Sequence, residues 1–287
     1  MLGRPNVGKS TLLNTLVGEK LSIVTAKPHT TRNRILGVLN RPEGQAVFVD
    51  TPGYSRDSSR VLHRLMARAL RQTREDADLI LLVTEAHRPI ELDEELMRLV
   101  TDSGAPAILV INKIDRLKSR DQLLPRLEAL QRYPFVEFVP IIARSGKNVD
   151  ALERAIMRHL PPGPAHYPAD YKTDQSDSFR AAEIIREKLM TELHQEIPYG
   201  IAVQIESMES SEPGRREIQA MIWIERESQK AIVIGKDGQV LKRVGSEARN
   251  DLNLLFGERI HLKLWVKVRE HWSDNVEELQ RLGYDSQ

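Results

Sequence analysis

Residues 3–10 read GRPNVGKS, and this stretch decides how the first part of the chain folds. It fills every fixed position of G-x-x-x-x-G-K-[ST], a loop that leads from a strand into a helix and surrounds phosphates. Gly3 and Gly8 let backbone N–H groups approach phosphate oxygens, because no Cβ stands in the way. We expect Lys9 to reach the β- and γ-phosphates and the Ser10 hydroxyl to ligate Mg²⁺. The stretch predicts a nucleotide site, with an ordinary glycine-bearing turn as the alternative.

A second motif, DTPG at residues 50–53, follows an apolar run that is typical of a buried strand. We expect Asp50 to hold Mg²⁺ through water and the N–H of Gly53 to sense the γ-phosphate. Alone, these four residues could equally form a turn after a strand. Their position downstream of the phosphate loop favours the metal-holding role.

A third motif, NKID at residues 112–115, ends another apolar strand. The carboxylate of Asp115 can accept hydrogen bonds from the N1–H and the exocyclic amine of guanine. Adenine has an unprotonated N1 and no amine at the corresponding position, so it would leave this carboxylate, which we expect to be buried, unpaired. Sites that depend on such a penalty discriminate strongly, by as much as ~10⁴-fold. A strand-to-helix cap is the alternative, and the order of the three motifs favours guanine.

A polar loop, HTTRN at residues 29–33, lies between the first two motifs. A threonine there can complete the Mg²⁺ shell while the γ-phosphate is present and leave it on hydrolysis. We favour Thr31 over Thr30 for this role. Ala143 follows the last strand of this part of the chain and could place its backbone N–H against the guanine O6.

The residue after DTPG is Tyr54, where many GTP-hydrolysing proteins carry a glutamine that orients the attacking water. A phenol cannot orient water as an amide does. We therefore expect intrinsic hydrolysis to be slow or to depend on another group.

The composition is that of a globular protein and is compatible with a reducing cytosol. The chain has 287 residues, a length that suggests two domains, and its formal net charge is +1. It contains no cysteine, which excludes disulfides, cysteine nucleophiles and thiolate metal sites. The sequence has no apolar run of about 18 residues, so it predicts no membrane-spanning helix.

Strand and helix patterns alternate over residues 1–160. The predicted strands are 46–50, 79–84, 107–112 and 138–142, and the predicted helices are 60–72, 92–101, 121–131 and 149–160. Such alternation favours an α/β domain with a parallel-rich sheet and helices on both faces. Residues 161–175 begin with four prolines in eight positions and lack apolar periodicity, which is typical of a linker.

Residues 176–287 follow a different order and predict an α+β domain with a C-terminal tail. The predicted elements are a helix at 179–196, strands at 201–208, 217–226 and 231–234, a helix to about residue 256 and a strand at 260–268. Residues 230–269 contain nine Lys and Arg but only four Asp and Glu, so this segment is net positive. Trp265, in the last of these strands, is more typical of a core residue than of a base-stacking platform.

A short motif, GKDG at residues 235–238, precedes the second helix of this domain. A G-x-x-G loop between a strand and a helix can clamp about four nucleotides of single-stranded RNA. A simple helix-start turn is the alternative, and the basic residues nearby favour RNA. The predicted RNA-binding residues are Gly235, Lys236, Asp237, Gly238, Lys242 and Arg243. Asp237 is an unexpected negative charge on such a loop.

The chain resembles the Era family of bacterial ribosome-associated GTPases. The resemblance rests on GRPNVGKSTLLN, TTRNR, DTPGY, NKID, EIIREKLM, VIGKDG and LWVKV, which occur in the family's order over nearly the whole chain. It implies a P-loop GTPase domain (residues 1–160), a linker (161–175) and a type II KH domain (176–287). It also implies binding to small-subunit ribosomal RNA near its 3′ end, a role in 30S assembly, and a cytoplasmic location with peripheral contact to the inner face of the cell membrane.

The resemblance also completes the predicted site. The residues expected to contact GTP or GDP are Gly3, Arg4, Pro5, Asn6, Val7, Gly8, Lys9, Ser10, Thr11, Asp50, Thr51, Pro52, Gly53, Tyr54, Asn112, Lys113, Ile114, Asp115 and Ala143. Lys9, Thr31 and Gly53 are the expected catalytic residues. Ser10, Thr31 and Asp50 are the expected Mg²⁺ ligands, and Asn6 is implied as a K⁺ ligand.

The chain departs from the family pattern at two places. Only Met1 and Leu2 precede Gly3, where the family has a buried strand. We therefore expect the sheet to lack the strand that positions the phosphate loop, through a misplaced start codon or a truncation. Ile142 stands where the family has a serine, so a hydroxyl is lost.

Two other functions compete with the GTPase switch. A tRNA-modification or tandem-domain GTPase would carry a C-terminal catalytic cysteine or a second phosphate loop, and the sequence has neither. An RNA-binding adaptor whose nucleotide domain turns over little is the other alternative.

Overall fold

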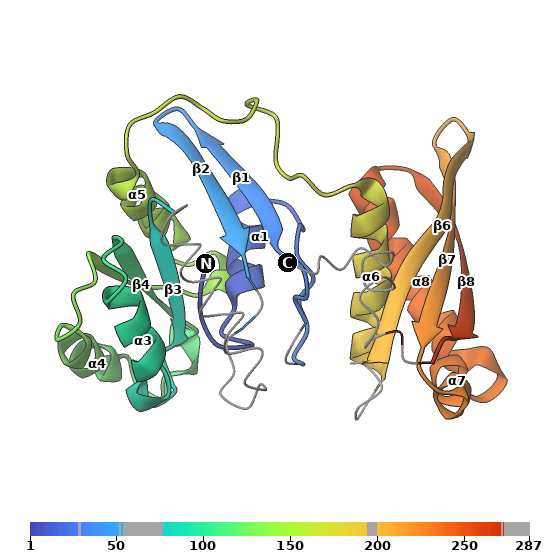
Figure 1. The fold of residues 1–287 in the computed structure, drawn as a ribbon, viewed down its shortest axis with the longest axis horizontal. Coiled ribbons are helices and arrows are strands. Elements are labelled where there is room, and N and C mark those ends of the chain that lie inside the picture. The colour runs from blue at the N-terminus through green and yellow to red at the C-terminus, as the bar shows by residue number, and fades with distance from the viewer. Residues whose placement is uncertain (28–29, 52, 54–76, 194–199, 271, 273–287) are drawn as a thin grey trace. The chain divides into compact units, whose positions relative to one another are not determined.

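The computed structural model describes residues 1–27, 30–51, 53, 77–193, 200–270 and 272 (Figure 1). The chain divides into two compact units. The first comprises Met1–Ser22 and Arg34–Asp174, and the second comprises Ile23–Asn33 and Gln175–Gln287. The segment Ile23–Asn33 thus groups with the second unit, although it lies early in the sequence. The predicted helix at residues 60–72 lies outside the described residues.

The first unit is built on a parallel sheet of β3 (Ile80–Glu85), β4 (Ala107–Asn112) and β5 (Glu137–Pro140), in that order. Every residue of β3 and β4 is buried. Parallel strands covered on both faces read as continuous apolar runs, which is why these two strands could be predicted closely from the sequence.

Helices cover both faces of this sheet, as predicted. The first layer holds α1 (Lys9–Val17) and α5 (Val149–His159), and the second holds α3 (Glu94–Thr101) and α4 (Leu123–Leu130). Successive side chains of a strand point to opposite faces. Leu81 and Val83 of β3 accordingly join the core under α1 and α5, whereas Ile80 and Leu82 join the core under α3 and α4.

An antiparallel hairpin of β1 (Ile35–Arg41) and β2 (Gly44–Asp50) completes the first unit. Only the second of these strands was predicted from the sequence. The hairpin is held at the start of the chain, where the N-terminal ammonium of Met1 donates to the carbonyl of Val49 at 2.8 Å.

Leu2 partly replaces the strand that we expected to be missing. Its N–H donates to Leu81 O, and its carbonyl accepts from Val83 N, each at 2.8 Å. This is a parallel bridge of one residue to Leu82. The predicted loss of pairing ahead of the phosphate loop is therefore incomplete, because Leu2 hydrogen-bonds to β3 directly before Gly3.

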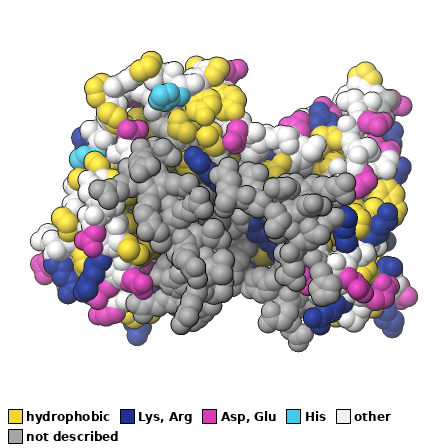
Figure 2. All heavy atoms as spheres, viewed as in Figure 1, with side chains coloured by type: hydrophobic (Ala, Val, Ile, Leu, Met, Phe, Trp, Pro, Cys, Tyr) yellow, Lys and Arg dark blue, Asp and Glu magenta, His cyan; other side chains and the backbone are white. Residues whose placement is uncertain are grey.

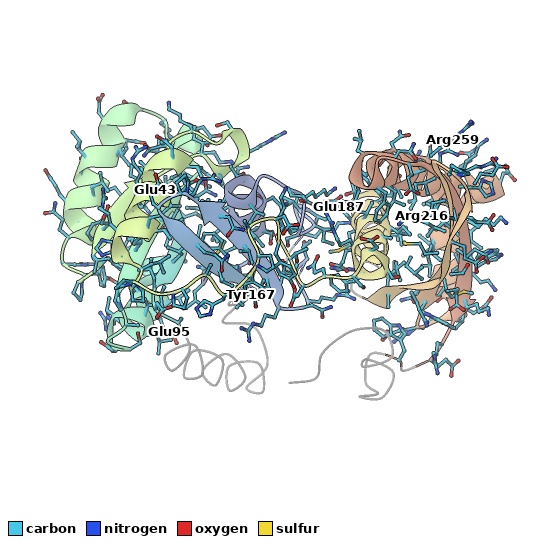
Figure 3. All side chains as sticks on the ribbon, turned by 90° about the horizontal axis from the view of Figure 1, so that it is seen from above. Glu43, Glu95, Tyr167, Glu187, Arg216 and Arg259 are labelled. Carbon is cyan, nitrogen blue, oxygen red and sulfur yellow. The ribbon has the colours of Figure 1, made fainter. Side chains whose placement is uncertain are left out.

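The segment after α5 runs along the edge of β1 within the first unit. The N–H of Val38 donates to Lys172 O at 2.8 Å, and the hydroxyl of Thr173 donates to Leu36 O at 2.8 Å. Tyr167, labelled in Figure 3, stacks on Tyr171 with ring centroids 4.8 Å apart. This segment overlaps the predicted linker at 161–175, and the unpaired edge of β1 explains why it is ordered against the sheet.

The second unit combines α6 (Asp177–Glu192), α7 (Glu227–Ile234) and α8 (Gln239–Phe256) with β6 (Ile201–Glu212), β7 (Arg215–Ile224) and β8 (Arg259–Val268). The strand order is β6-β7-β8, with β6 and β7 antiparallel and β7 and β8 parallel. Alternate residues of β7 (Ile218, Ala220, Ile222 and Ile224) form a core with α6 and α8. The α/β unit followed by this α+β unit confirms the predicted fold class.

One predicted element is wrong. Residues 231–234 form the end of α7 and not a strand. A run of four apolar residues is too short for its period to be recognised. Hydrogen bonds at the start of α7 favour the helix. The side-chain carbonyl of Gln229 accepts from the N–H groups of Glu225 and Arg226 at 3.0 and 3.1 Å. Such a capping box satisfies N–H groups that the helix leaves unpaired.

Candidate functional site

The phosphate loop turns tightly between Leu2 and α1. Gly8 has φ 105°, and Gly3 has φ 149°. A Cβ at Gly3 would lie 2.4 Å from Val83 O, and a Cβ at Gly8 would lie 2.2 Å from the amide nitrogen of Asn112. Both glycines are therefore required by close approach as well as by backbone angle.

Lys9 is buried at the first position of α1. Its Nζ donates to the carbonyls of Gly3 and Arg4, each at 3.0 Å. Burial lowers the pKa of Lys9 to about 8, and the neighbouring carboxylate of Asp50 opposes that shift. Two carbonyls of the loop thus fix the direction of the Lys9 ammonium group.

Ser10 and Asp50 meet in the interior of the first unit. The Ser10 hydroxyl donates to Asp50 Oδ2 at 2.7 Å, and the Ser22 hydroxyl lies 3.3 Å from the same oxygen. Asp50 is fully buried, and its Oδ1 has no hydrogen-bond partner among the described residues. Burial raises the pKa of Asp50, and Lys9 opposes this shift. A buried carboxylate oxygen without a partner, beside a hydroxyl, suits an oxygen-seeking cation.

Gly53 lies directly against the phosphate loop. A Cβ there would be 2.6 Å from both the nitrogen and the Cα of Pro5. The hydroxyl of Thr51 donates to Met1 O at 2.9 Å, which ties this stretch to the start of the chain. The predicted contacts Pro52 and Tyr54 lie outside the described residues.

Asn112 joins three segments of the site. Its amide nitrogen donates to Val7 O at 2.8 Å, and its Oδ1 accepts from the N–H groups of Lys113 and Ala143 at 2.8 and 2.9 Å. The ammonium of Lys113 donates to Asn6 O at 2.5 Å. The sequence placed Asn112 and Lys113 in the site, but their role as connectors of its loops appears only in the structure.

Asp115 follows in a 3₁₀ turn, Ile114–Arg116, and is solvent-exposed. We expected this carboxylate to be buried. The difference has a simple cause, since the turn lies beyond the carboxyl end of β4, where the sheet no longer covers it.

Ala143 is held by a residue that the sequence analysis missed. The hydroxyl of Thr15, on α1, donates to Ala143 O at 2.8 Å. The N–H of Ala143 already donates to Asn112, so its predicted contact with the guanine O6 stays a prediction. Thr15 lies five positions after Ser10, but a threonine within an amphipathic helix carries no signal that would have identified it.

Thr30 and Thr31 lie in the segment that belongs to the second unit. There the carbonyl of Thr30 accepts from the guanidinium of Arg186 at 2.6 Å, and the N–H of Val24 donates to Glu187 at 2.9 Å. Both partners lie on α6, where Figure 3 labels Glu187. The structure therefore does not bring Thr31 together with Ser10 and Asp50 in one unit.

The GKDG loop connects α7 to α8. Gly235 and Gly238 have φ of 76° and 73°, and Asp237 has φ 52°. A Cβ at Gly235 would lie 2.4 Å from a side-chain methyl of Val240. Asp is one of the few residues with a side chain that tolerate this left-handed region. The backbone therefore explains Asp237, whose charge was unexpected on the loop.

The basic residues near this loop are exposed. Lys236 and Lys242 are exposed, and Arg243 pairs with Glu192 of α6 at 2.6 Å. On the face drawn in Figure 2, basic and acidic side chains of this unit are interspersed. Charge alone therefore does not mark a single site.

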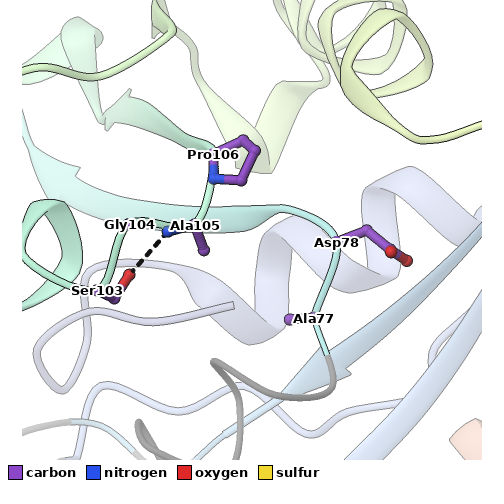
Figure 4. Close-up of a pocket in the computed structure, with 6 residues that line it drawn as sticks. All are labelled: Ala77, Asp78, Ser103, Gly104, Ala105 and Pro106. Atoms are coloured by element: carbon purple, nitrogen blue, oxygen red, sulfur yellow. Dashed lines mark hydrogen bonds between the residues drawn. The ribbon is translucent and has the colours of Figure 1, made fainter.

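A pocket on the first unit lies away from all these residues. It is lined by Ala77, Asp78, Ser103, Gly104, Ala105 and Pro106 (Figure 4). These residues precede β3 and β4, whereas open α/β sheets bind ligands at the carboxyl ends of their strands. The phosphate loop and Asn112 occupy that other end.

Comparisons with known proteins agree with this geometry. Residues 1–113 match a family model described as a 50S ribosome-binding GTPase, and residues 196–273 match the KH domain. GTPase Era of Glaesserella parasuis serovar 5 (strain SH0165) is 46% identical over 285 residues, which cover 99% of this chain and 95% of the relative. GTPase Era of Haemophilus ducreyi is 45% identical, with 99% and 94% covered.

Two solved structures are similar over nearly their full length. An Aquifex aeolicus Era variant bound to GDP and AlF4⁻ has a TM-score of 0.90 at 41% identity, covering 99% of this chain and 97% of that one. An Era in complex with MgGDPNP and nucleotides 1506–1542 of 16S ribosomal RNA has a TM-score of 0.89 at 42% identity, covering 99% and 96%. The chain therefore belongs to the Era family of GTPases.

Proposed function

We propose that this GTPase binds and hydrolyses GTP at the site formed by Ser10, Asp50 and Asn112, and that it binds small-subunit ribosomal RNA near its 3′ end. In this proposal it assists assembly of the 30S subunit. The observation that carries the nucleotide part is the buried Ser10–Asp50 pair beside the phosphate loop. The solved relative that holds nucleotides 1506–1542 of 16S ribosomal RNA supports the RNA part.

Ser10 and Asp50 fit a magnesium ion. A buried polar atom without a partner costs about 1–3 kcal/mol, and Asp50 Oδ1 is such an atom among the described residues. An ion reached directly by Ser10 and through water by Asp50 would satisfy it, with Thr31 as the proposed third ligand. When bound, Mg²⁺ neutralises charge on the β- and γ-phosphates.

Lys9 and Gly53 are the residues that we propose to act on the γ-phosphate. The ammonium of Lys9 is already aimed by the carbonyls of Gly3 and Arg4. A phosphate beside it would favour the charged form that burial disfavours. The close approach of Gly53 to Pro5, where a Cβ would lie 2.6 Å from the Pro5 backbone, supports the proposal that the Gly53 N–H senses a terminal phosphate.

We propose that Asp115 selects guanine. Asn112 holds the turn in place through Val7 and Ala143, so the Asp115 carboxylate stands at a defined position at the end of β4. Guanine offers this exposed carboxylate its N1–H and 2-amine as donors, whereas adenine has an unprotonated N1 and no amine at that position. A bound base would cover the carboxylate from water, so adenine would leave it unpaired and be disfavoured. The other residues that we expected from the sequence to contact GTP or GDP keep that role in this proposal.

The RNA-binding part of the proposal rests on the GKDG loop. Its two glycines have positive φ angles between α7 and α8, and a G-x-x-G loop of this kind can clamp about four nucleotides. Lys236, Lys242 and Arg243 supply positive charge for the phosphates. The alternative of an adaptor with an idle nucleotide domain is not favoured, because the chain belongs to a family of GTPases.

One experiment tests both halves of this proposal. GTP turnover and binding of a labelled RNA carrying the small-subunit 3′ end are measured with the full chain, Lys9→Ala and Lys236→Ala, with Arg154→Ala as an exposed charge-removal control on α5. We expect Lys9→Ala to lose turnover by at least ~100-fold and keep RNA binding. Lys236→Ala should weaken RNA binding and keep turnover.

The outcomes separate the two halves. If the full chain hydrolyses GTP no faster than Lys9→Ala, the nucleotide proposal is wrong. If it hydrolyses GTP but binds no RNA, the RNA proposal is wrong instead. The same assay with Na⁺ in place of K⁺ tests Asn6 as a potassium ligand, which is contradicted if turnover is unchanged.

Within the described residues, no helix has both the length and the apolar content needed to cross a bilayer. We propose a cytoplasmic location with peripheral contact to the inner face of the cell membrane. Fractionation of cells that express the chain tests this, and recovery in neither the cytosolic nor the salt-extractable membrane fraction would contradict it.

A further inference from the structure

The face of the sheet turned away from α6 and α8 is basic and aromatic along β8. Residues of β8 that alternate with the core positions share this face, and they are Arg259, His261, Lys263, Trp265 and Lys267, continued by Arg269. The strand order makes β8 an edge strand among the described residues. Figure 3 labels Arg259 at the start of this strand. Four of the six side chains are Lys or Arg.

Trp265 is exposed at the middle of this face, with 43% of its surface accessible. We expected it to be a core residue. Alternation along β8 decides otherwise, because its neighbours Leu264 and Val266 pack on the core and Trp265 must point the other way. It lies opposite Met221 in the register with β7. An indole ring is thus available at the surface of a rigid strand.

Cationic side chains flank this indole at two-residue intervals, roughly 7 Å along the strand. The ammonium of Lys263 pairs with Glu217 at 2.6 Å. The ammonium of Lys267 lies 6.0 Å from the ring centroid of Trp223, and the guanidinium of Arg269 lies 5.4 Å from it. Trp223 is itself fixed, because its indole N–H donates to Gln204 at 3.0 Å.

We propose that this outer face of β7 and β8 binds single-stranded RNA, with a base stacked on Trp265 and phosphates beside Lys263 and Lys267. Proteins that bind single strands combine aromatic stacking platforms with flanking cations in this way, and an open sheet can carry the platform. The surface is separate from the GKDG loop, which lies between two helices. The inference rests on the proposed RNA-binding function and extends it to a longer strand.

The chemistry of the face favours RNA over an anionic membrane surface. The exposed apolar group is a single indole on a flat strand, whereas interfacial membrane binding uses a continuous apolar face. Cations that alternate with one aromatic ring match a repeating chain of phosphates and bases. Glu217 on the same face of β7 would repel an anionic membrane surface that approached as a plane, but a single strand can follow β8 alone.

The test compares two RNA lengths on the full chain. Labelled single strands of four and twelve nucleotides, both from the small-subunit 3′ end, are titrated against wild type, Trp265→Ala, Trp265→Phe and Lys267→Ala. Two variants serve as controls. Leu254→Ala removes an exposed apolar side chain elsewhere and is the control for Trp265→Ala, and Arg154→Ala removes an exposed charge elsewhere and is the control for Lys267→Ala. Thermal unfolding of each variant shows that it is folded.

We expect Trp265→Ala to weaken binding of the twelve-nucleotide strand about tenfold, the loss of one stacked base, and to leave the four-nucleotide strand unchanged. Trp265→Phe should recover most of the loss, because it keeps a ring. Lys267→Ala should lower the slope of log affinity against log salt by about 0.7 for the long strand only. Both control variants should bind as wild type does.

Five results would overturn the inference. Two of them are that Trp265→Ala leaves binding of the long strand unaffected, or that it weakens binding of both lengths equally, which would indicate a structural effect on the unit. A third is that Trp265→Ala reduces binding only to vesicles of phosphatidylcholine with one-quarter phosphatidylglycerol, which would make the partner a membrane. If the wild-type chain bound neither strand, the proposed RNA-binding function and this inference would both be wrong. Binding of the short strand alone would contradict only the inference.

Discussion

Asn112 is the residue on which the geometry of the nucleotide site depends most. It is buried at the end of β4 and links the phosphate loop at Val7 to the loop at Ala143. It also accepts from the N–H of Lys113 at the turn that carries Asp115. One side chain therefore joins the phosphate loop, the Ala143 loop and the turn that carries Asp115.

Replacing Asn112 by alanine should be costly for this reason. The change leaves the carbonyl of Val7 and the N–H of Ala143 unpaired, at about 1–3 kcal/mol for each buried group. We expect Asn112→Ala to lower the free energy of unfolding of the first unit by about 2–4 kcal/mol and to weaken GDP binding. Denaturant unfolding measures the first effect, with Asn250→Ala on the exposed side of α8 as a control. An unchanged midpoint would show that water replaces both hydrogen bonds.

At the scale of the element, α3 begins at a carboxylate that the fold disfavours. Asp93 precedes Glu94–Thr101, its side chain is buried, and it makes no side-chain cap hydrogen bond. Burial raises the pKa of Asp93 to about 6, against the opposing effects of Arg4 and Arg126. The native state therefore holds this proton at pH values where the unfolded chain, with a pKa near 3.8, has lost it.

This shift predicts a pH dependence with a definite sign. Between pH 4 and 6 the native state binds more protons than the unfolded state, so stability falls as pH rises, by an amount on the order of 2–3 kcal/mol. Asp93→Asn should remove this slope and raise stability at pH 7. Unfolding midpoints of the two proteins across pH 4–7 measure it. Asp102→Asn is the control, because Asp102 is exposed at the other end of α3, and it should keep the wild-type dependence of stability on pH. If the stability of Asp93→Asn changed with pH in the same way as that of the wild type does, the assignment to Asp93 would be contradicted.

At the scale of the whole molecule, the two units have hydrophobic cores with no residue in common. Leu109 is fully buried in the sheet of the first unit, and Ile222 is fully buried in the sheet of the second. Nucleotide is proposed to bind mainly to residues of the first unit. Binding to the folded form stabilises whichever unit carries the site.

Two unfolding transitions are therefore expected. Leu109→Ala and Ile222→Ala should each cost about 2–5 kcal/mol, through the cavity left behind, but in different transitions. Excess GDP with Mg²⁺ should raise the transition that Leu109→Ala lowers. Differential scanning calorimetry measures all three effects. A single transition that both substitutions lower would show that the units unfold together.

The proposed nucleotide site is recognisable in the sequence because the chemistry proposed for it requires particular residue types at particular spacings. Phosphate and metal binding would demand Gly3, Gly8, Lys9 and Ser10, so their pattern stands out without a structure. The strands β3 and β4 were predictable for a different reason. Strands buried on both faces must be continuously apolar, and such runs are conspicuous in a polar sequence.

Other features could not be predicted, because they depend on what lies opposite in space. Residues 231–234 form helix behind a cap formed by Gln229, and a run of four apolar residues fits either secondary structure. Thr15 entered the site through a contact with a residue 128 positions away. Trp265 is a different case, because the alternation of β8 is visible in the sequence and the residue was wrongly expected in the core.

The sequence by itself determined the ligand chemistry, the order of the motifs and the two-part fold class, because each depends on residue type and spacing along the chain. Only the tertiary structure decided that Asn112 joins the loops of the site, that Leu2 pairs with β3, and that the segment carrying Thr31 packs with α6. These are contacts between segments far apart in sequence. Hydrogen bonds and packing across such distances depend on which groups the folded chain brings together, and no local pattern records them.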